Sequence, residues 1–453
     1  MAGHEKFGFP TSEDLKHKVD ALGLSITLSD DLSILGKRVP VNATFAPNAF
    51  AILPMEGCDS NLDGSPSELV ERRYLRFFQG GAGLIWWEAN AVVQEGKANE
   101  HQMMLTRSNL PRFAALLDHA KREGFKRNGY VPLSILQLTH SGRYSRPVGH
   151  AAKPIICQHD PLLDSRCGID EQYAVCSDDY LESLVPAYVA SALLAKEAGF
   201  DGVDIKACHR YLLSELLASH TREGKYGGSF ENRIRLMTDI VTEIKRACGK
   251  DFIIASRFNI FDAHPYPYGF GEDEQDSWTF KADEPTKLVS SLVSAGVSLL
   301  SNSAGNPYYI HPQVTRPFDT SSMGIPIPNE HPLESIERLF SFNRLVQENA
   351  QGIPVVGNGY SWLRHYLPHV GAANLEKGIC RFVGLGRMAI AYPDAPRDVL
   401  LEGRMQIAKC CIACSKCTQI MRDHGMTGCV IRDSEVYAPL YKDARNDAVK
   451  RGM

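Results

Sequence analysis

Four cysteines near the end of the chain have the spacing of ligands to an inorganic cofactor. They are Cys411, Cys414, Cys417 and Cys429, in the pattern C-x2-C-x2-C-x11-C. The tight triplet can fold around one side of a small inorganic core and the distant fourth thiolate can close it, as the four cysteines of a 4Fe-4S cluster do. A structural zinc site is the alternative, but it usually shows two separate C-x2-C pairs. Cys410 competes with Cys411, which the spacing favours, and we expect a 4Fe-4S cluster.

The composition of the chain is that of an ordinary globular protein. Of its 453 residues 44% are hydrophobic and 23% are charged, and the net charge of −4 indicates neither nucleic acid nor a membrane surface as a partner. We find no run of about 18 apolar residues and no signal-peptide core. The expected location is therefore cytoplasmic, where thiols stay reduced and the twelve cysteines do not form disulfides.

Short apolar runs recur along the chain and predict the strands that position these groups. Their near-continuous apolar character is typical of parallel strands that are buried on both faces of a sheet. We expect strands at Ala49–Pro54, Leu84–Ala89, Pro132–Gln137, Gly202–Lys206, Ile253–Arg257, Leu299–Asn302, Pro354–Gly357 and Arg381–Val383.

Amphipathic segments between these runs predict helices. Examples are Leu181–Ala198 and Asn232–Ala247, the second with a stripe of apolar residues at helical spacing and with Ser229 as the expected N-cap. Eight β–α units predict an α/β protein, a (β/α)8 TIM barrel. A doubly wound open sheet is the alternative, but no G-x-G-x-x-G fingerprint opens a helix after an early strand.

The chain is expected to divide into three parts. Residues 1–37 form an N-terminal lead-in, residues 38–400 the (β/α)8 barrel, and residues 401–453 a short C-terminal iron–sulfur segment. The insertion Arg143–Asp179 follows the third strand, and so we expect it at the carboxyl face of the barrel, where barrel enzymes do their chemistry.

Seven segments, in order along residues 38–435, resemble motifs of the Old Yellow Enzyme (NADH:flavin oxidoreductase) family. The resemblance is to its iron–sulfur branch, to the barrel part of 2,4-dienoyl-CoA reductase and trimethylamine dehydrogenase. The segments are LPMEGCD (Leu53–Asp59), GGAGLIWWEANAVVQEG (Gly80–Gly96), LQLTHSGRYSRP (Leu136–Pro147), AGFDGVDIKACHRYLLSELL (Ala198–Leu217), YGGSFENRIR (Tyr226–Arg235), VVGNG (Val355–Gly359) and VGLGRMAIAYPD (Val383–Asp394).

The resemblance implies noncovalent FMN and residues that hold it. It places Pro54, Met55 and Ala89 along the flavin edge, Gln137 on the pyrimidine ring, and Arg257 as the cation that stabilises the reduced ring. For Arg257 a salt bridge at a strand end is the alternative. A phosphate needs converging backbone N–H groups and a bidentate cation. The expected phosphate-binding residues, after the seventh and eighth strands, are Gly357, Asn358, Gly359, Gly386 and Arg387.

The segment Lys206–Tyr211 matches the family's substrate clamp in part. The family usually has His, then His or Asn three residues on, then Tyr two further on; here His209 and Tyr211 match, but the first position is Lys206. The implied roles are polarisation of a carbonyl oxygen by Lys206 and His209 and proton donation by Tyr211. Lys206 pairing with a nearby Asp or Glu is the alternative. Glu56 is a second departure, because a carboxylate there would disfavour an anionic reduced flavin unless it points away.

The resemblance implies an FMN- and 4Fe-4S-dependent reductase of the C=C bond of an α,β-unsaturated carbonyl or carboxyl compound. Larger relatives continue into dinucleotide-binding domains, so the expected electron donor is free NAD(P)H at the flavin or a separate protein at the cluster. One alternative is an amine dehydrogenase that exports electrons through the cluster, with Trp86, Trp87 and Tyr144 as candidate aromatic walls. Another is a non-catalytic electron-transfer subunit. A homo-oligomer is left open.

Overall fold

The computed structural model describes residues 4–308, 317–321, 325–327 and 329–452. Its centre is an eight-stranded parallel sheet in the order β8-β7-β6-β5-β4-β3-β10-β9. The strands are β3 (Phe50–Ile52), β4 (Leu84–Ala91), β5 (Leu133–Thr139), β6 (Gly202–Ile205), β7 (Ile253–Phe261), β8 (Leu299–Ala304), β9 (Val356–Gly357) and β10 (Phe382–Leu385). A parallel bridge between Leu300 and Val355 joins β8 to β9, the two ends of this order. The sheet is therefore closed into a (β/α)8 barrel, as the sequence predicts.

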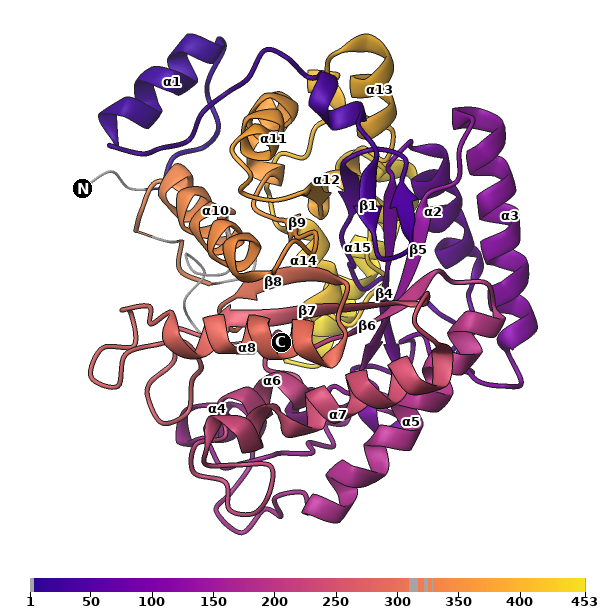
Figure 1. Ribbon diagram of the computed structural model, residues 1–453, viewed down its shortest axis with the longest axis vertical. Helices are drawn as coiled ribbons and strands as arrows, with labels where there is room; N and C mark the ends of the chain where they lie inside the picture. Colours follow the sequence, from indigo (N-terminus) through magenta and orange to yellow (C-terminus); the bar gives the residue numbers. More distant parts are fainter. Residues whose placement is uncertain (1–3, 309–316, 322–324, 328, 453) are drawn as a thin grey trace.

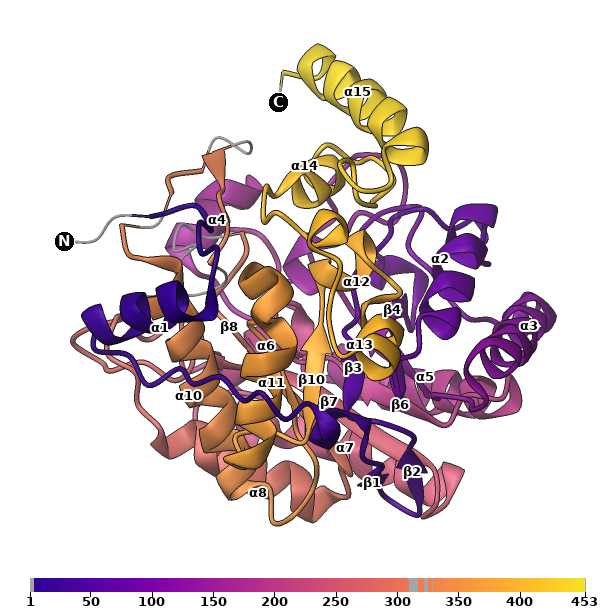
Figure 2. The same cartoon turned by 90° about the horizontal axis from the view of Figure 1, so that it is seen from above.

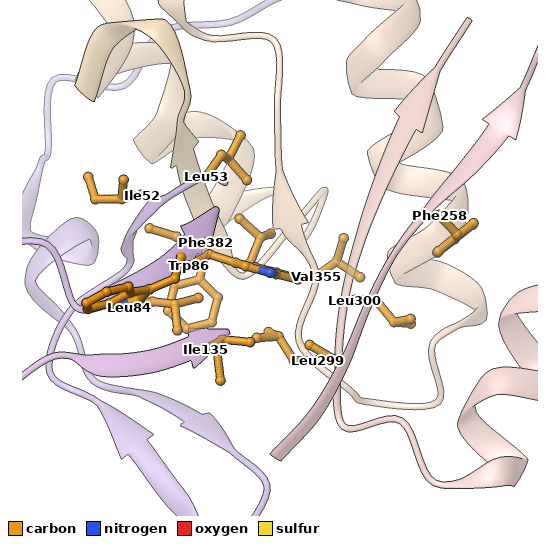
Figure 3. Close-up of a cluster of buried hydrophobic side chains, with 14 of the residues drawn as sticks. Ile52, Leu53, Leu84, Trp86, Ile135, Phe258, Leu299, Leu300, Val355 and Phe382 are labelled. Carbon is orange, nitrogen blue, oxygen red and sulfur yellow. The ribbon is translucent and has the colours of Figure 1, made fainter. Parts of the chain in front are cut away.

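All eight expected strands are present, each within a few residues of its predicted bounds. Every residue of β3, β4, β5 and β6 is buried, because helices cover the outside of the barrel and side chains fill its inside. The interior layer includes Trp86, Ile135, Leu299, Val355 and Phe382, which approach one another from different strands (Figure 3).

Helices follow the strands and surround the barrel (Figure 1). They are α2 (Glu68–Gln79), α3 (Leu110–Asn128), α5 (Asp178–Glu197), α7 (Phe230–Cys248), α8 (Asp283–Ala295), α10 (Pro332–Asn349), α11 (Leu367–Glu376), α12 (Arg387–Ala391) and α13 (Ala395–Glu402). The hydroxyl of Ser229 caps α7 by accepting a hydrogen bond from Asn232 N–H at 3.3 Å, which confirms the expected N-cap. Local sequence thus sets where this helix begins.

The segments outside the repeat lie at the two ends of the barrel. The antiparallel hairpin of β1 (Val39–Val41) and β2 (Thr44–Ala46) is at one end, after α1 (Ser12–Ala21). The helices α14 (Lys416–Arg422) and α15 (Ser434–Lys450) are at the other end (Figure 2). The insertion after β5 carries α4 (Pro161–Cys167), and α6 (Leu212–Leu217) follows β6. No helix in the described ranges is long and apolar enough to cross a membrane.

Candidate functional site

The carboxyl ends of the strands surround a cavity of about 190 Å³. Met55 comes from the loop after β3, Gln137 from β5, Lys206 from the end of β6, and Arg257 from β7. Cys417 of α14 lines the same cavity from the opposite side. The cavity therefore lies between the barrel and the C-terminal segment.

A buried carboxylate at the floor of the cavity orients Gln137. Asp204 accepts hydrogen bonds from Gln137 Nε2 at 2.6 Å, from Trp86 Nε1 at 2.9 Å and from the Arg257 backbone N–H at 2.7 Å. Burial raises the pKa of Asp204 to about 6 although these donors lower it. Because the amide nitrogen of Gln137 is engaged, its carbonyl oxygen is the group that it can offer to a ligand N–H.

Arg257 supplies positive charge to the cavity. Its Nη1 donates to the Pro54 carbonyl at 3.4 Å, and its guanidinium forms no ion pair with a carboxylate of the described residues. The alternative of a strand-end salt bridge has no counterpart in that part of the chain. A planar cation beside a cavity is suited to an electron-rich ring edge.

A second cavity of about 110 Å³ shares Met55, Arg257 and Arg387 with the first. Backbone at Asn358, Gly359 and Gly386 lines it. Gly359 has φ +97°, and a side chain at Gly386 would meet nothing nearer than the Met55 sulfur at 3.8 Å. Glycine thus lets backbone N–H groups face this space.

Arg387 is held over this second cavity by two contacts. Its Nη2 donates to Thr418 Oγ1 at 2.9 Å and its guanidinium lies 4.3 Å from the centre of the Phe318 ring. Arg387 forms no ion pair with a carboxylate among the residues that the structure describes. The charge and the exposed backbone together suit a phosphate.

Most residues predicted for the flavin and the substrate line these two cavities. They are Pro54, Met55, Gln137, Lys206, His209, Tyr211, Arg257, Asn358, Gly359, Gly386 and Arg387. Ala89 and Gly357 are not among the lining residues. The Ala89 carbonyl accepts from Gln102 Nε2 at 3.3 Å, and a side chain at Gly357 would lie 2.9 Å from the Cys380 sulfur.

Lys206 forms an ion pair with Glu56 across the cavity. The Lys206 Nζ lies 2.9 Å from Glu56 Oε1, and the two side chains are 2% and 16% exposed. The ammonium also lies 3.9 Å from the centre of the Tyr211 ring. The alternative in which Lys206 pairs with a carboxylate is therefore observed. The same contact shows that the Glu56 carboxylate points toward Lys206.

The Tyr211 hydroxyl joins this pair to a second tyrosine. It lies 3.5 Å from Glu56 Oε1 and 3.2 Å from the Tyr308 hydroxyl. Burial and the Glu56 charge hold the pKa of Tyr211 well above its ordinary value, so the phenol is protonated at neutral pH. Tyr308 stacks on Tyr144 at 3.8 Å. The sequence marks Glu56 only as a departure beside the flavin, without a role, and no local spacing marks Tyr308.

The structure corrects two of the candidate aromatic walls. Tyr144 lines a neighbouring cavity of about 360 Å³ that shares Tyr211 and Tyr308 with the first, but Trp86 and Trp87 belong to the core. The Trp86 indole donates to Asp204, and Trp87 stacks on Tyr74 at 3.6 Å. The residues at a strand's inner and outer faces alternate, and neither face of β4 brings an indole to the cavity.

A buried ion-pair network shapes the loop that carries His209. His209 and Arg210 have φ of +65° and +57°, a region that non-glycine residues seldom occupy. Arg210 pairs with Asp160 at 3.2 Å and with Asp262 at 3.1 Å. This anchoring places the His209 Nε2 at 3.3 Å from Ser303 Oγ, facing the cavity.

The four predicted cysteine ligands lie in and around α14: Cys411 and Cys414 precede it, Cys417 is in its first turn, and Cys429 follows it. Backbone N–H groups of Ala413 and Arg432 donate to the Cys411 and Cys429 sulfurs at 3.4 and 3.3 Å. Burial, and then the neighbouring Cys417, raises the pKa of Cys411 to about 12. Within the described ranges no group of three or more Cys, His, Asp or Glu has the geometry of a formed metal site.

Several contacts fasten this cysteine-bearing segment to the mouth of the barrel. Thr427 N–H donates to the Gly57 carbonyl at 2.7 Å, and Arg422 Nη2 donates to the Pro307 carbonyl at 2.6 Å. Asp433 pairs with Arg72 and Arg76 of α2 at 2.7 and 2.6 Å. The segment is thereby held beside the residues of the first cavity.

Comparison with known proteins decides the family. The model of the NADH:flavin oxidoreductase / NADH oxidase family matches residues 44–295. The chain belongs to this family of enzymes. Its relatives include an NADH oxidase of Thermoanaerobacter brockii, 28% identical over 81% of this chain and 50% of the relative, and a cinnamate reductase of Clostridium sporogenes, 25% identical over 89% and 58%.

Solved structures share the fold of this flavin oxidoreductase. A 2-naphthoyl-CoA reductase complex superposes with a TM-score of 0.69 at 20% identity, over 88% of this chain and 57% of that one. A histamine dehydrogenase from Rhizobium sp. 4-9 gives 0.66 at 21% identity, over 88% and 52%. The chain thus spans about half the length of these relatives.

Proposed function

We propose that this flavin oxidoreductase uses FMN and a 4Fe-4S cluster to reduce the C=C bond of an α,β-unsaturated carbonyl or carboxyl compound. The observation that carries this proposal is the Tyr211 hydroxyl, a buried and protonated phenol that lines the same cavity as Gln137 and Arg257. An enolate formed beside that hydroxyl has a proton donor within the site.

The residues present fit a flavin mononucleotide. Gln137 and Arg257 would meet the polar ring edge, and Asn358, Gly359, Gly386 and Arg387 the phosphate. Neither Arg257 nor Arg387 forms an ion pair within the described residues, which leaves both positive charges for an anionic ligand. When bound, FMN supplies the hydride for the β-carbon.

The thiols of Cys411, Cys414, Cys417 and Cys429 fit a 4Fe-4S cluster in number and in spacing. Backbone N–H groups aimed at two of the sulfurs fit the negative charge that cluster thiolates carry. When bound, such a cluster passes single electrons to or from a donor protein. Cys410 donates instead to the Gln406 carbonyl at 3.6 Å, which leaves Cys411 as the ligand.

Lys206, His209 and Tyr211 have separate tasks in this proposal. An ammonium has three N–H bonds, so the one to Glu56 leaves Lys206 able to donate to a substrate oxygen together with His209. Polarisation of that oxygen draws electron density from the β-carbon. Tyr211 then gives its proton to the α-carbon, and the Tyr308 hydroxyl at 3.2 Å can return one.

The Lys206 ammonium also argues against an amine substrate. Three tyrosines and the Glu56 carboxylate would suit a substrate cation. Lys206 itself occupies that position, since it lies against both Glu56 and the Tyr211 ring. A second ammonium there would face like charge. We therefore favour the reductase over the amine dehydrogenase, and over an electron-transfer subunit that would need no buried proton donor.

The test uses anaerobically purified enzyme, with flavin, iron and acid-labile sulfide counted. Chemically reduced enzyme is mixed with enones and enoates, oxidised enzyme is mixed with amines, and NADH and NADPH are tried as donors. We expect reduction of the C=C bond. In a Tyr211→Phe variant, enoates should reoxidise the reduced flavin on the order of 10²- to 10⁴-fold more slowly, whereas quinones should react at the normal rate. Bleaching of the oxidised flavin by amines, with no alkene reduced, would refute the proposal.

A further inference from the structure

An outer cavity of about 360 Å³ continues the first one toward solvent. The two share Glu56, Tyr211, Tyr308, Met421 and Arg422. A molecule whose reacting carbon lies at Tyr211 would therefore extend past Arg422 into the outer cavity. The volume suits a small organic molecule better than a nucleotide.

Three arginines and two carboxylates line the outer cavity. The arginines are Arg146, Arg166 and Arg422, and of the three histidines in the wall His424 is neutral at pH 7, because burial lowers its pKa to about 4. Of its two carboxylates, Glu56 pairs with Lys206, whereas Glu100 stays in the wall, where it accepts from the Gly149 N–H at 3.0 Å. The arginines of this wall therefore outnumber the carboxylates that could balance them.

Arg422 and Arg146 are the two cations best placed for a ligand. Arg422 donates to the Pro307 carbonyl at 2.6 Å, which holds its guanidinium at the junction of the two cavities. Neither arginine forms an ion pair with a carboxylate in the part of the chain that the structure describes. Burial lowers the pKa of Arg422, as expected for a cation whose charge the protein does not balance.

We propose that Arg422 and Arg146 bind an anionic group of the substrate in the outer cavity, so that the substrate carries this anion in addition to its reacting carbonyl. This inference rests on the proposed function. The chemistry recognised is an oxyanion that accepts paired N–H bonds from arginine, and the size of the cavity favours a carboxylate over the phosphate of a coenzyme A thioester. Lys206, already paired with Glu56, is then left to the reacting carbonyl.

The experiment compares an acid with its uncharged analogue in the holoenzyme. The substrates are 4-(3-oxobut-1-enyl)benzoate, an enone whose carboxylate is separate from its reacting carbonyl, and the corresponding benzamide. Their 4-(3-oxobutyl) analogues are the saturated ligands, whose binding perturbs the flavin absorbance. Arg422→Gln should weaken binding and kcat/KM for the acids by about 10- to 100-fold and those for the amides by less than about 3-fold. Arg146→Gln should act in the same direction, and added salt should weaken acid binding alone.

The control is Arg344→Gln, a change on the exposed side of α10 away from both cavities. It should leave all four ligands unaffected. Equal losses for acid and amide, or no loss for either, would overturn the inference. Cinnamoyl-CoA binding that depends on Arg422 while binding of the benzoate does not would assign the oxyanion to phosphate and overturn the carboxylate. If no alkene is reduced at all, the proposed function fails, and the saturated ligands still decide this inference.

Discussion

The ion pair between Glu56 and Lys206 provides the sharpest quantitative prediction. The variants are Glu56→Gln, Lys206→Met and the double change, each close in size to the native side chain. Lys206 is 2% exposed and cannot move its ammonium to water, whereas Glu56 is 16% exposed and can recover some hydration. We therefore expect Glu56→Gln to cost more stability than Lys206→Met, and the double variant to regain much of the loss.

The expected size follows from the geometry. Unit charges 2.9 Å apart attract by about 6 kcal/mol at an effective dielectric constant of about 20. The cost of removing both charges from water offsets much of this, but loss of one partner leaves a buried charge alone and costs about 3–5 kcal/mol. With an unfolding entropy of about 2.1 cal/mol/K per residue, a chain of 453 residues would lose roughly 3–5 °C in Tm.

The assay is a double-mutant cycle on the flavin-loaded protein, followed by calorimetry and by flavin fluorescence. The coupling free energy between Glu56 and Lys206 should be about 3 kcal/mol. The pair Arg107–Glu197, whose side chains are 71% and 51% exposed, is the control, and its coupling should be about 0.2–1 kcal/mol. A coupling for the cavity pair no larger than that of the control would refute the reasoning.

Three further predictions concern the cluster, a buried acid and a helix cap. Cys429→Ser should lower bound iron and labile sulfide while FMN stays, and one equivalent of zinc without sulfide in the native protein would contradict the cluster. Asp204 has a folded pKa of about 6 against 3.8 unfolded, so the folded state binds the proton more tightly. Ionisation of Asp204 should therefore lower the free energy of unfolding progressively from about pH 4 to pH 6, by roughly 3 kcal/mol in all, and have no further effect above about pH 6. Denaturation curves of Asp204→Asn should lack this dependence on pH. The same dependence in the variant would contradict the raised pKa. Ser229→Ala should cost about 1 kcal/mol in urea denaturation, whereas Ser229→Asp, which keeps the cap, should cost little.

The sequence by itself determined the barrel. A parallel strand buried on both faces must be apolar along its length, so each of the eight strands was visible as a short run without knowledge of its neighbours. The Ser229 cap is equally local, because its partner is the Asn232 N–H three residues on. Cys411, Cys414 and Cys417 are close together in the sequence, and with Cys429 they predict a cluster from spacing alone. The cluster itself stays a proposal.

Only the tertiary structure decided how the polar groups of the cavity are partnered. Glu56 and Lys206 are 150 residues apart and Tyr211 and Tyr308 are 97 apart, so no period or motif relates them. Arg422 reaches the cavity because the C-terminal segment is fastened to the barrel mouth. A buried strand can be predicted from its own apolar residues. A contact between two loop side chains depends instead on how separate loops pack, and that packing is settled by the whole fold.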